Sequence, residues 1–135
     1  MSRPVVVLPD VEAAIKALLT ARLAARPDAV VTGCKVWVGD DPKTNPKIHV
    51  VRVSGSIATP AHDNPLIDFR VWHNRPDQAM ELARIAAAEL RSVEGAAAGA
   101  ARVTFDTELM GPTRTIDPVD GNTPQVFFRH QFFIR

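Results

Sequence analysis

The side chains best suited to metal binding or proton transfer are the four histidines, at positions 49, 62, 73 and 130. Zinc sites place His and Cys at short fixed spacings, and a helical metal pair needs two ligands one turn apart. Neither spacing occurs here, and the single cysteine, Cys34, has no partner for an intrachain disulfide. We therefore interpret His73 as a turn-packing residue, His130 as a hydrogen-bonded sheet residue and Cys34 as a buried, inert thiol.

Carboxylates suited to acid–base chemistry occur as three pairs: Asp40 with Asp41, Asp106 with Glu108, and Asp117 with Asp120. Two of the pairs lie in proline-rich loops, where aspartate is a common turn residue. A two-carboxylate hydrolase also needs a cleft, which the pattern does not indicate. The Ser-Gly-Ser run at residues 54–56 lacks the strand–turn–helix context of a nucleophile elbow. We predict no catalytic residue, no cofactor and no metal, so the chain is expected not to be an enzyme.

The overall composition fits one soluble domain over residues 1–135, with 46% hydrophobic and 23% charged residues. The net charge of +1 gives no general attraction to nucleic acid or anionic membranes. Arg70, Trp72 and Arg129 form a basic, aromatic set, but acidic residues are interleaved with them along the strands. The apolar run at residues 5–8 is too short for a signal peptide or a membrane span. We expect no membrane partner and a cytosol-like compartment or a particle assembled there.

Hydrophobic periodicity predicts the elements that must position these side chains. A first helix runs from the cap Asp10 to about residue 25, and Pro27 ends it. Strands are predicted at residues 30–38, 48–58, 66–73, 102–110 and 126–135. Turns or connectors are predicted at 59–65 and 96–101, and long polar loops at 39–47 and 111–124.

Residues 63–93 contain one strand, a tight turn and an alanine-rich helix over about residues 76–93. Asn74 or Arg75 is the cap, Pro76 fits the first helical turn, and Asp77 favours the positive helix end. The resulting order is α-β-β-β-α-β-β. It predicts an α+β fold with a mostly antiparallel sheet covered on one face by two helices.

The last predicted strand is apolar on both faces. One face carries Phe128, His130 and Phe132, and the other carries Phe127, Arg129 and Phe133. A solvated face would not be this apolar, which indicates a second covered surface. Two interpretations remain open: a contact between subunits, or core packing under a loop.

The whole layout resembles the tail terminator (tail completion) proteins of long-tailed bacteriophages. The resemblance covers about residues 4–135. It rests on the helix LPDVEAAIKALLTARL, on the strand that continues into HNRPDQAMELARIAAAELRSV, and on the final strands split by a long loop. These features form a pattern of elements without a specific chemical signature. Neck and head-completion connector proteins share the same architecture and remain an alternative, as does a small α+β binding module or enzyme.

The resemblance implies a homo-oligomeric ring, typically a hexamer, on the head-proximal end of the tail tube in the virion, assembled in the host cytoplasm. Its partners would be the major tail tube protein and a neck or head-completion protein, with DNA only passing through the lumen. Proline-stiffened loops suit such contacts because they lose less entropy on docking. The expected contact residues lie in the two long loops and on the last strand: Asp40, Asp41, Lys43, Lys47, Arg114, Asp117, Asp120, Phe127, Arg129 and Phe133.

Overall fold

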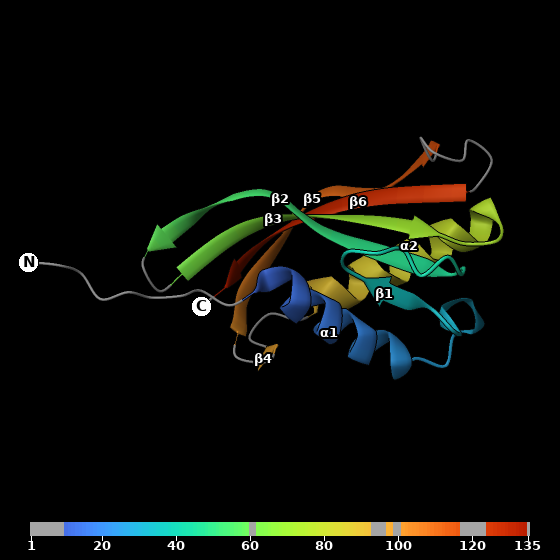
Figure 1. Cartoon of the computed structure of the whole chain (residues 1–135), viewed down its shortest axis with the longest axis horizontal. Helices are drawn as coiled ribbons and strands as arrows, with labels where there is room; N and C mark the ends of the chain where they lie inside the picture. Colours follow the sequence, from blue (N-terminus) through green and yellow to red (C-terminus); the bar gives the residue numbers. More distant parts are fainter. Residues whose placement is uncertain (1–9, 60–61, 93–96, 99–100, 117–123, 135) are drawn as a thin grey trace, which may run out of the picture.

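The computed structural model describes residues 10–59, 62–92, 97–98, 101–116 and 124–134. Two helices, one short 3₁₀ turn and six strands form the described part of the chain (Figure 1). In chain order they are α1 (Val11–Ala24), η1 (Ala29–Val31), β1 (Lys35–Trp37), β2 (Lys47–Thr59), β3 (His62–Trp72), α2 (Pro76–Arg91), β4 (Ala97–Ala98), β5 (Ala101–Ile116) and β6 (Pro124–Ile134).

The strands form one sheet in the order β1-β2-β3-β6-β5-β4. The four long strands in the centre are antiparallel to their neighbours, and β1 pairs in parallel with the first residues of β2. β4 pairs in antiparallel with the first two residues of β5. The predicted α+β class, the mostly antiparallel sheet and the order of the main elements are confirmed.

Both helices lie on the same side of the sheet, as Figure 1 shows. The core fills the space between the two layers, and its large side chains are fully buried. The strands contribute alternate residues to it, as their pleat requires. The main members from the strands are Ile48, Val50, Ile67, Phe69, Val71, Val126, Phe128, Phe132 and Ile134.

Helix α1 begins as the sequence predicts, because the Asp10 side chain accepts a hydrogen bond from the Ala13 backbone N–H at 3.2 Å. Its buried stripe, Val11, Ile15, Leu19 and Leu23, follows helical spacing. Helix α2 is capped at Arg75 with Pro76 in the first turn, as predicted. Four alanines on its buried side let it pack closely against the sheet.

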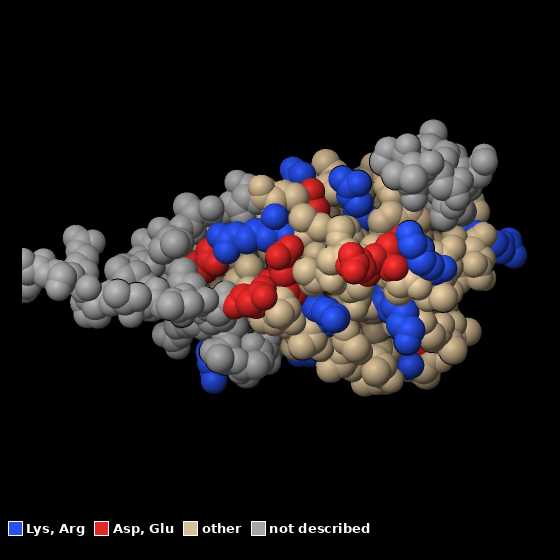
Figure 2. All heavy atoms as spheres, viewed as in Figure 1, with Lys and Arg blue, Asp and Glu red and all other residues tan. Residues whose placement is uncertain are grey.

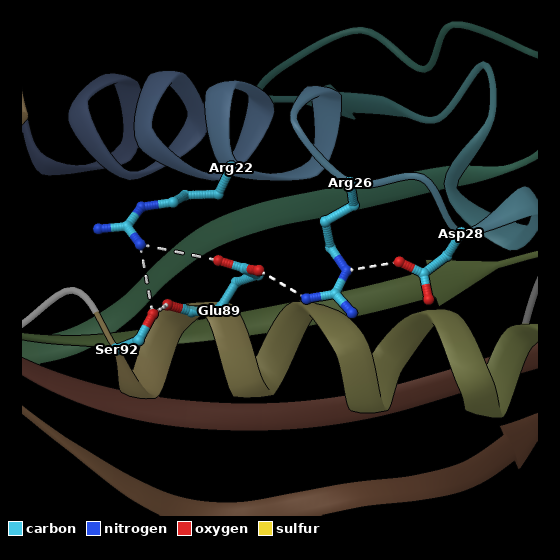
Figure 3. Close-up of polar contacts among 5 residues, drawn as sticks. All are labelled: Arg22, Arg26, Asp28, Glu89 and Ser92. Carbon is cyan, nitrogen blue, oxygen red and sulfur yellow. Dashed lines mark hydrogen bonds and ion pairs between the residues drawn. The ribbon is translucent and has the colours of Figure 1, made fainter.

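A charged network joins the C-terminal halves of the two helices (Figure 3). Glu89 of α2 accepts a hydrogen bond from Arg26 Nη1 at 2.7 Å and lies 3.8 Å from Arg22 Nη1. Arg26 also donates through Nε to Asp28 at 2.8 Å, and this bond lowers the pKa of Asp28. Ser92 completes the network, since its hydroxyl accepts from Arg22 and donates to the Glu89 carbonyl. The helices are therefore tied to each other as well as to the sheet.

Four predicted element boundaries are wrong. The predicted turn at 59–65 is mostly strand, because β2 continues to Thr59 and β3 begins at His62. The predicted strand at 30–38 is a 3₁₀ turn followed by the short strand β1. Between them, Gly33 has a φ of 73°, which is incompatible with a continuous extended strand. The connector at 96–101 contains β4. The predicted loop at 111–124 is strand through Ile116 and again from Pro124, so only residues 117–123 remain, and they lie outside the described residues.

Candidate interaction surfaces

The histidines and the cysteine have structural surroundings. His73 lies 3.0 Å through Nε2 from the Val30 carbonyl, and its Nδ1 accepts the Asn74 backbone N–H at 2.8 Å. Nε2 therefore carries the proton, and the ring fastens the β3–α2 junction to η1, as the turn-packing interpretation predicted. Burial raises the pKa of the Cys34 thiol to about 12, which leaves it protonated and unreactive at neutral pH.

His130 is fully buried and lies between the rings of Phe69, Phe128 and Phe132. Its Nε2 is 3.3 Å from Glu108 Oε2, the same oxygen that accepts a short hydrogen bond from Arg91 on α2. His130 is therefore a buried sheet residue beside a carboxylate, which confirms its predicted place in the sheet, whereas the predicted hydrogen bond of its ring is not established by this contact. Among the described residues, no three His, Cys, Asp or Glu side chains are grouped to hold a metal ion.

The first predicted contact loop, residues 39–47, is folded against an aromatic cluster. Lys47 Nζ donates to both carboxylate oxygens of Asp41, at 2.8 and 3.0 Å. The same ammonium lies 5.5 Å from the Trp37 ring centre and 5.1 Å from that of Trp72, within cation–π range. His49 stacks on Trp37 with ring centres 4.6 Å apart. The aromatic cluster is thus Trp37, His49 and Trp72, with Lys47 over it.

Electrostatics in this region follow from the same contacts. The Lys47 ammonium lowers the pKa of Asp41, with help from the Lys43 backbone N–H that donates to Asp41 Oδ1 at 2.8 Å. Partial burial lowers the pKa of His49, and the positive charge of Arg70 acts in the same direction. Asp41 and Lys47 neutralise each other, which leaves the exposed Asp40 and Lys43 as the outward charges of the loop.

The second surface is the sheet face opposite the helices. Arg129 of β6 forms two hydrogen bonds to Asp68 on the neighbouring strand β3, at 2.5 and 3.1 Å. This pairing raises the pKa of Arg129. The Phe127 ring lies beside it, 5.5 Å from the Arg129 guanidinium and 6.0 Å from that of Arg70. The half-buried aromatic ring therefore contacts two cations.

A shallow hollow of about 480 Å³ continues this face towards β5. It is lined by Phe127 and Arg70 together with Met110, Thr113, Arg114, Thr115 and Gln125. A larger hollow of about 810 Å³ follows α2, and its lining includes arginine, aspartate, glutamate and apolar residues. On the side of the molecule in Figure 2, basic and acidic residues are intermixed without a large area of one sign.

The predicted contact residues are only partly brought together. Phe127, Arg129 and Phe133 share the open sheet face, whereas Asp41 and Lys47 lie at the aromatic cluster. Arg114 belongs to strand β5 opposite Val126, which corrects its assignment to a loop. Its neighbours in that predicted loop, Asp117 and Asp120, lie outside the described residues.

The sequence interpretation did not predict the contacts that Trp37, Trp72 and Asp68 make on these surfaces. Trp37 and Trp72 are 35 positions apart in the chain and lie on β1 and β3, which both pair with β2. Only the strand order brings them to a ring-centre distance of 5.4 Å. Asp68 lies directly opposite Arg129, and this position depends on the β3–β6 register. In the part of the chain that the structure describes, no helix is long and apolar enough to cross a membrane.

Comparison with solved structures finds a similar fold in a chain of a structure described as "Virion of native gene transfer agent (GTA) particle". The TM-score is 0.57 at 14% sequence identity, and the match covers 88% of this chain and 92% of the other chain. At this identity the likeness shows a shared fold. No protein-family model and no curated protein matches the chain.

Proposed function

We propose that this chain is a structural, non-catalytic protein of a phage-like virion. The observation that carries the proposal is the fold shared with a chain of the gene transfer agent virion, because the match extends over nearly the whole of both chains. With 88% of this chain and 92% of the other covered, the likeness concerns most of the arrangement of helices and sheet. A shared fold alone does not fix function, so the proposal also depends on the surfaces described above.

Within such a particle, the role that we propose is a tail terminator: a closed ring that caps the head-proximal end of the tail tube and joins the tail to the neck. A closed ring needs two different complementary surfaces on each subunit, plus two faces for its axial partners. The open sheet face offers half-buried aromatic and arginine side chains, which are typical of interface centres. The 39–47 loop supplies a second, polar surface that its own ion pair holds in place.

The direct test combines native mass spectrometry and electron microscopy of the purified chain with a binding assay on tail tubes of its own particle. The expected result is a ring, either in solution or on the tube end. A chain that stays monomeric at high concentration and also fails to bind tubes would contradict the proposal.

A charge reversal tests the proposed role of the 39–47 loop. Lys43→Glu is expected to weaken tube binding by roughly tenfold, since rim charges contribute to recognition and each such factor corresponds to about 1.4 kcal/mol. Lys16→Glu is the matched control, because Lys16 is also exposed and lies on α1, outside the loop. Equal weakening of tube binding by the two variants would show that the loop is not part of the tube contact.

Deletion of the gene separates the terminator from a neck connector, which the same fold likeness also fits. Over-long tails are expected for a terminator, because nothing stops tube polymerisation. Tails of normal length that fail to join filled heads would instead identify a connector.

A further inference from the structure

On both sides of the sheet, a short terminal strand covers only a small part of the outer edge of the long strand beside it, among the residues that the structure describes. On one side, β4 pairs only with Ala101 and Arg102 of β5. On the other side, β1 pairs only with the first three residues of β2, Lys47 to His49. Over the residues that the structure describes, no strand lies against the outer edge of β5 at 103–116 or of β2 at 50–59. Such edges are templates for pairing with another chain.

Each of these edge strands contains a bulge that exposes an apolar side chain. Val53 is skipped between the pairs Arg52–Ile67 and Ser54–Leu66, and Leu109 is skipped between Glu108–His130 and Met110–Arg129. Val53 is 46% exposed, Leu109 51% and Met110 42%. These three are the exposed large hydrophobic residues in the described part of the chain. A protected edge usually carries charges at such positions, so apolar residues there indicate a contact.

The two bulges lie at nearly the same level along the strands. One row of paired residues crosses the sheet through Val51, Asp68, Arg129 and Met110. Val53 is two residues from one end of that row, and Leu109 is adjacent to the other end. An edge contact without a large stagger between two copies would therefore bring the apolar residues together.

Strand direction supports the same arrangement. From β2 through β3 and β6 to β5, each strand is antiparallel to the next, so β2 and β5 run in opposite directions. If copies are related by rotation about an axis roughly along the strands, β5 of one copy meets β2 of the next antiparallel. The alternation then continues around a closed ring, whatever the number of subunits.

The contact region on β2 is limited to its second half. The Arg52 backbone N–H already donates to the Glu12 side chain at 3.0 Å, so helix α1 occupies the edge at that residue. β1 covers the first residues of β2, and β4 covers the first residues of β5. The first residues of β2 and the first residues of β5 lie at opposite ends of the sheet. The short strands β1 and β4 that cover them therefore restrict how far the edges of neighbouring copies can slide past each other.

From these observations we infer that the β5 edge of one copy pairs antiparallel with the 53–59 edge of β2 in the next copy, with Leu109 and Met110 against Val53. The occupant is a second copy because both halves of the contact are present on one chain, at matching level and with opposite direction. This inference rests on the proposed ring and adds the surface that closes it.

Cysteine crosslinking tests the contact directly. Cys34 is first replaced by serine, and Val53→Cys and Leu109→Cys are then combined in one chain. A short bis-maleimide added to assembled rings, in solution or on tubes, is expected to give a covalent ladder up to the full ring. Linking within one chain is prevented because β3 and β6 separate the two residues by about three strand spacings, or ~14 Å.

Two controls give the result its meaning. Either single-cysteine variant should give no ladder, since a head-to-tail contact needs both edges. Val53→Cys with Ala88→Cys should also give none, because Ala88 is exposed on α2, away from the edges. Rings that form without crosslinking of the Val53 and Leu109 pair, or dimers from one single-cysteine variant, would overturn the inference and leave the proposed function standing. Failure to form rings and to bind tubes would overturn both.

A charge variant provides a second readout that does not depend on crosslinking. Leu109→Lys is expected to weaken subunit association by at least about tenfold, because it would bury an unpaired ammonium in the contact. The monomer should keep its circular dichroism spectrum, since Leu109 is exposed in the single chain. Ala88→Lys adds the same charge outside the edges and should leave association unchanged; equal weakening by both variants would contradict the inference.

Discussion

The two faces of the same strands are stabilised in different ways. On the helix-covered face, β6 contributes Val126, Phe128 and Phe132, which are fully buried against aliphatic and aromatic neighbours. On the open face, the alternate residues Phe127 and Arg129 are half-buried and are ordered by cation–π contacts and an ion pair. The comparison teaches that apolar residues on both sides of a strand do not have the same role. The residues on the covered face stabilise the fold, whereas Phe127 on the open face leaves apolar surface accessible to solvent.

The strongest way to test this difference is to truncate one phenylalanine on each face. Phe128→Ala is expected to lower the free energy of unfolding by about 3–5 kcal/mol, because it leaves a cavity where Phe128 stacks on Phe69 at 4.7 Å. Phe127→Ala should cost only about 1 kcal/mol. Urea unfolding followed by circular dichroism measures both. Equal losses would mean that the open face is part of the core.

The ion pair on the open face should have an intermediate effect. Asp68→Asn is expected to cost about 1 kcal/mol, since it weakens two charge-assisted hydrogen bonds to a partly exposed arginine. A double-mutant cycle with Arg129→Gln measures the coupling between the two residues. Additive single effects would show that the pair contributes no coupling energy and only occupies the face.

The aromatic cluster at the edge of this face should be less sensitive still. Lys47→Ala removes the ammonium from both tryptophans and from Asp41, with an expected loss of roughly 0.5–1 kcal/mol. Both tryptophans of the chain lie in this cluster, so intrinsic fluorescence reports on it directly. Lys43→Ala is the control, since its side chain is exposed; a matching spectral change there would argue against a role for Lys47.

The smallest expected effect is a pH dependence of stability from His49. Its pKa is lowered from 6.5 in the folded state, mainly by burial, so folding favours the neutral ring. The stabilisation is complete above pH 6.5 and is lost as the pH falls from there towards the folded pKa. His49→Phe keeps an aromatic ring beside Trp37 and should show a smaller drop in unfolding free energy between pH 7.5 and 5.5. An unchanged drop would assign the dependence to other groups.

Periodicity predicts the covered face well because one physical requirement, burial, dictates every second residue of a strand. The alternation from Val126 to Ile134 and the cap at Asp10 are local signals, and both are confirmed. The stop of β5 was misplaced because Gly111 and Pro112 are typical loop residues. Pro112 is tolerated in the strand because it lies at an edge, in a gap of the register between Met110 and Thr113.

The open-face contacts depend on information that no single segment carries. The pairing of Asp68 with Arg129 requires the β3–β6 register, which joins residues 61 positions apart. The meeting of Trp37 and Trp72 requires β2 to lie between their strands. Sequence reasoning found Phe127 and Arg129 as surface residues, but the partners that hold them follow only from the order of the strands.

The position of Phe127 between Arg70 and Arg129 has a consequence for the behaviour of the chain in solution. A bare aromatic ring on a flat sheet would promote random association of newly made copies. The guanidinium groups of Arg70 and Arg129 bring hydrated charges beside that ring, at 6.0 and 5.5 Å from its centre, and the ring stays close to the surface. We therefore expect the two cations to limit non-specific association through this ring, while a matching surface can still contact it by displacing or sharing them.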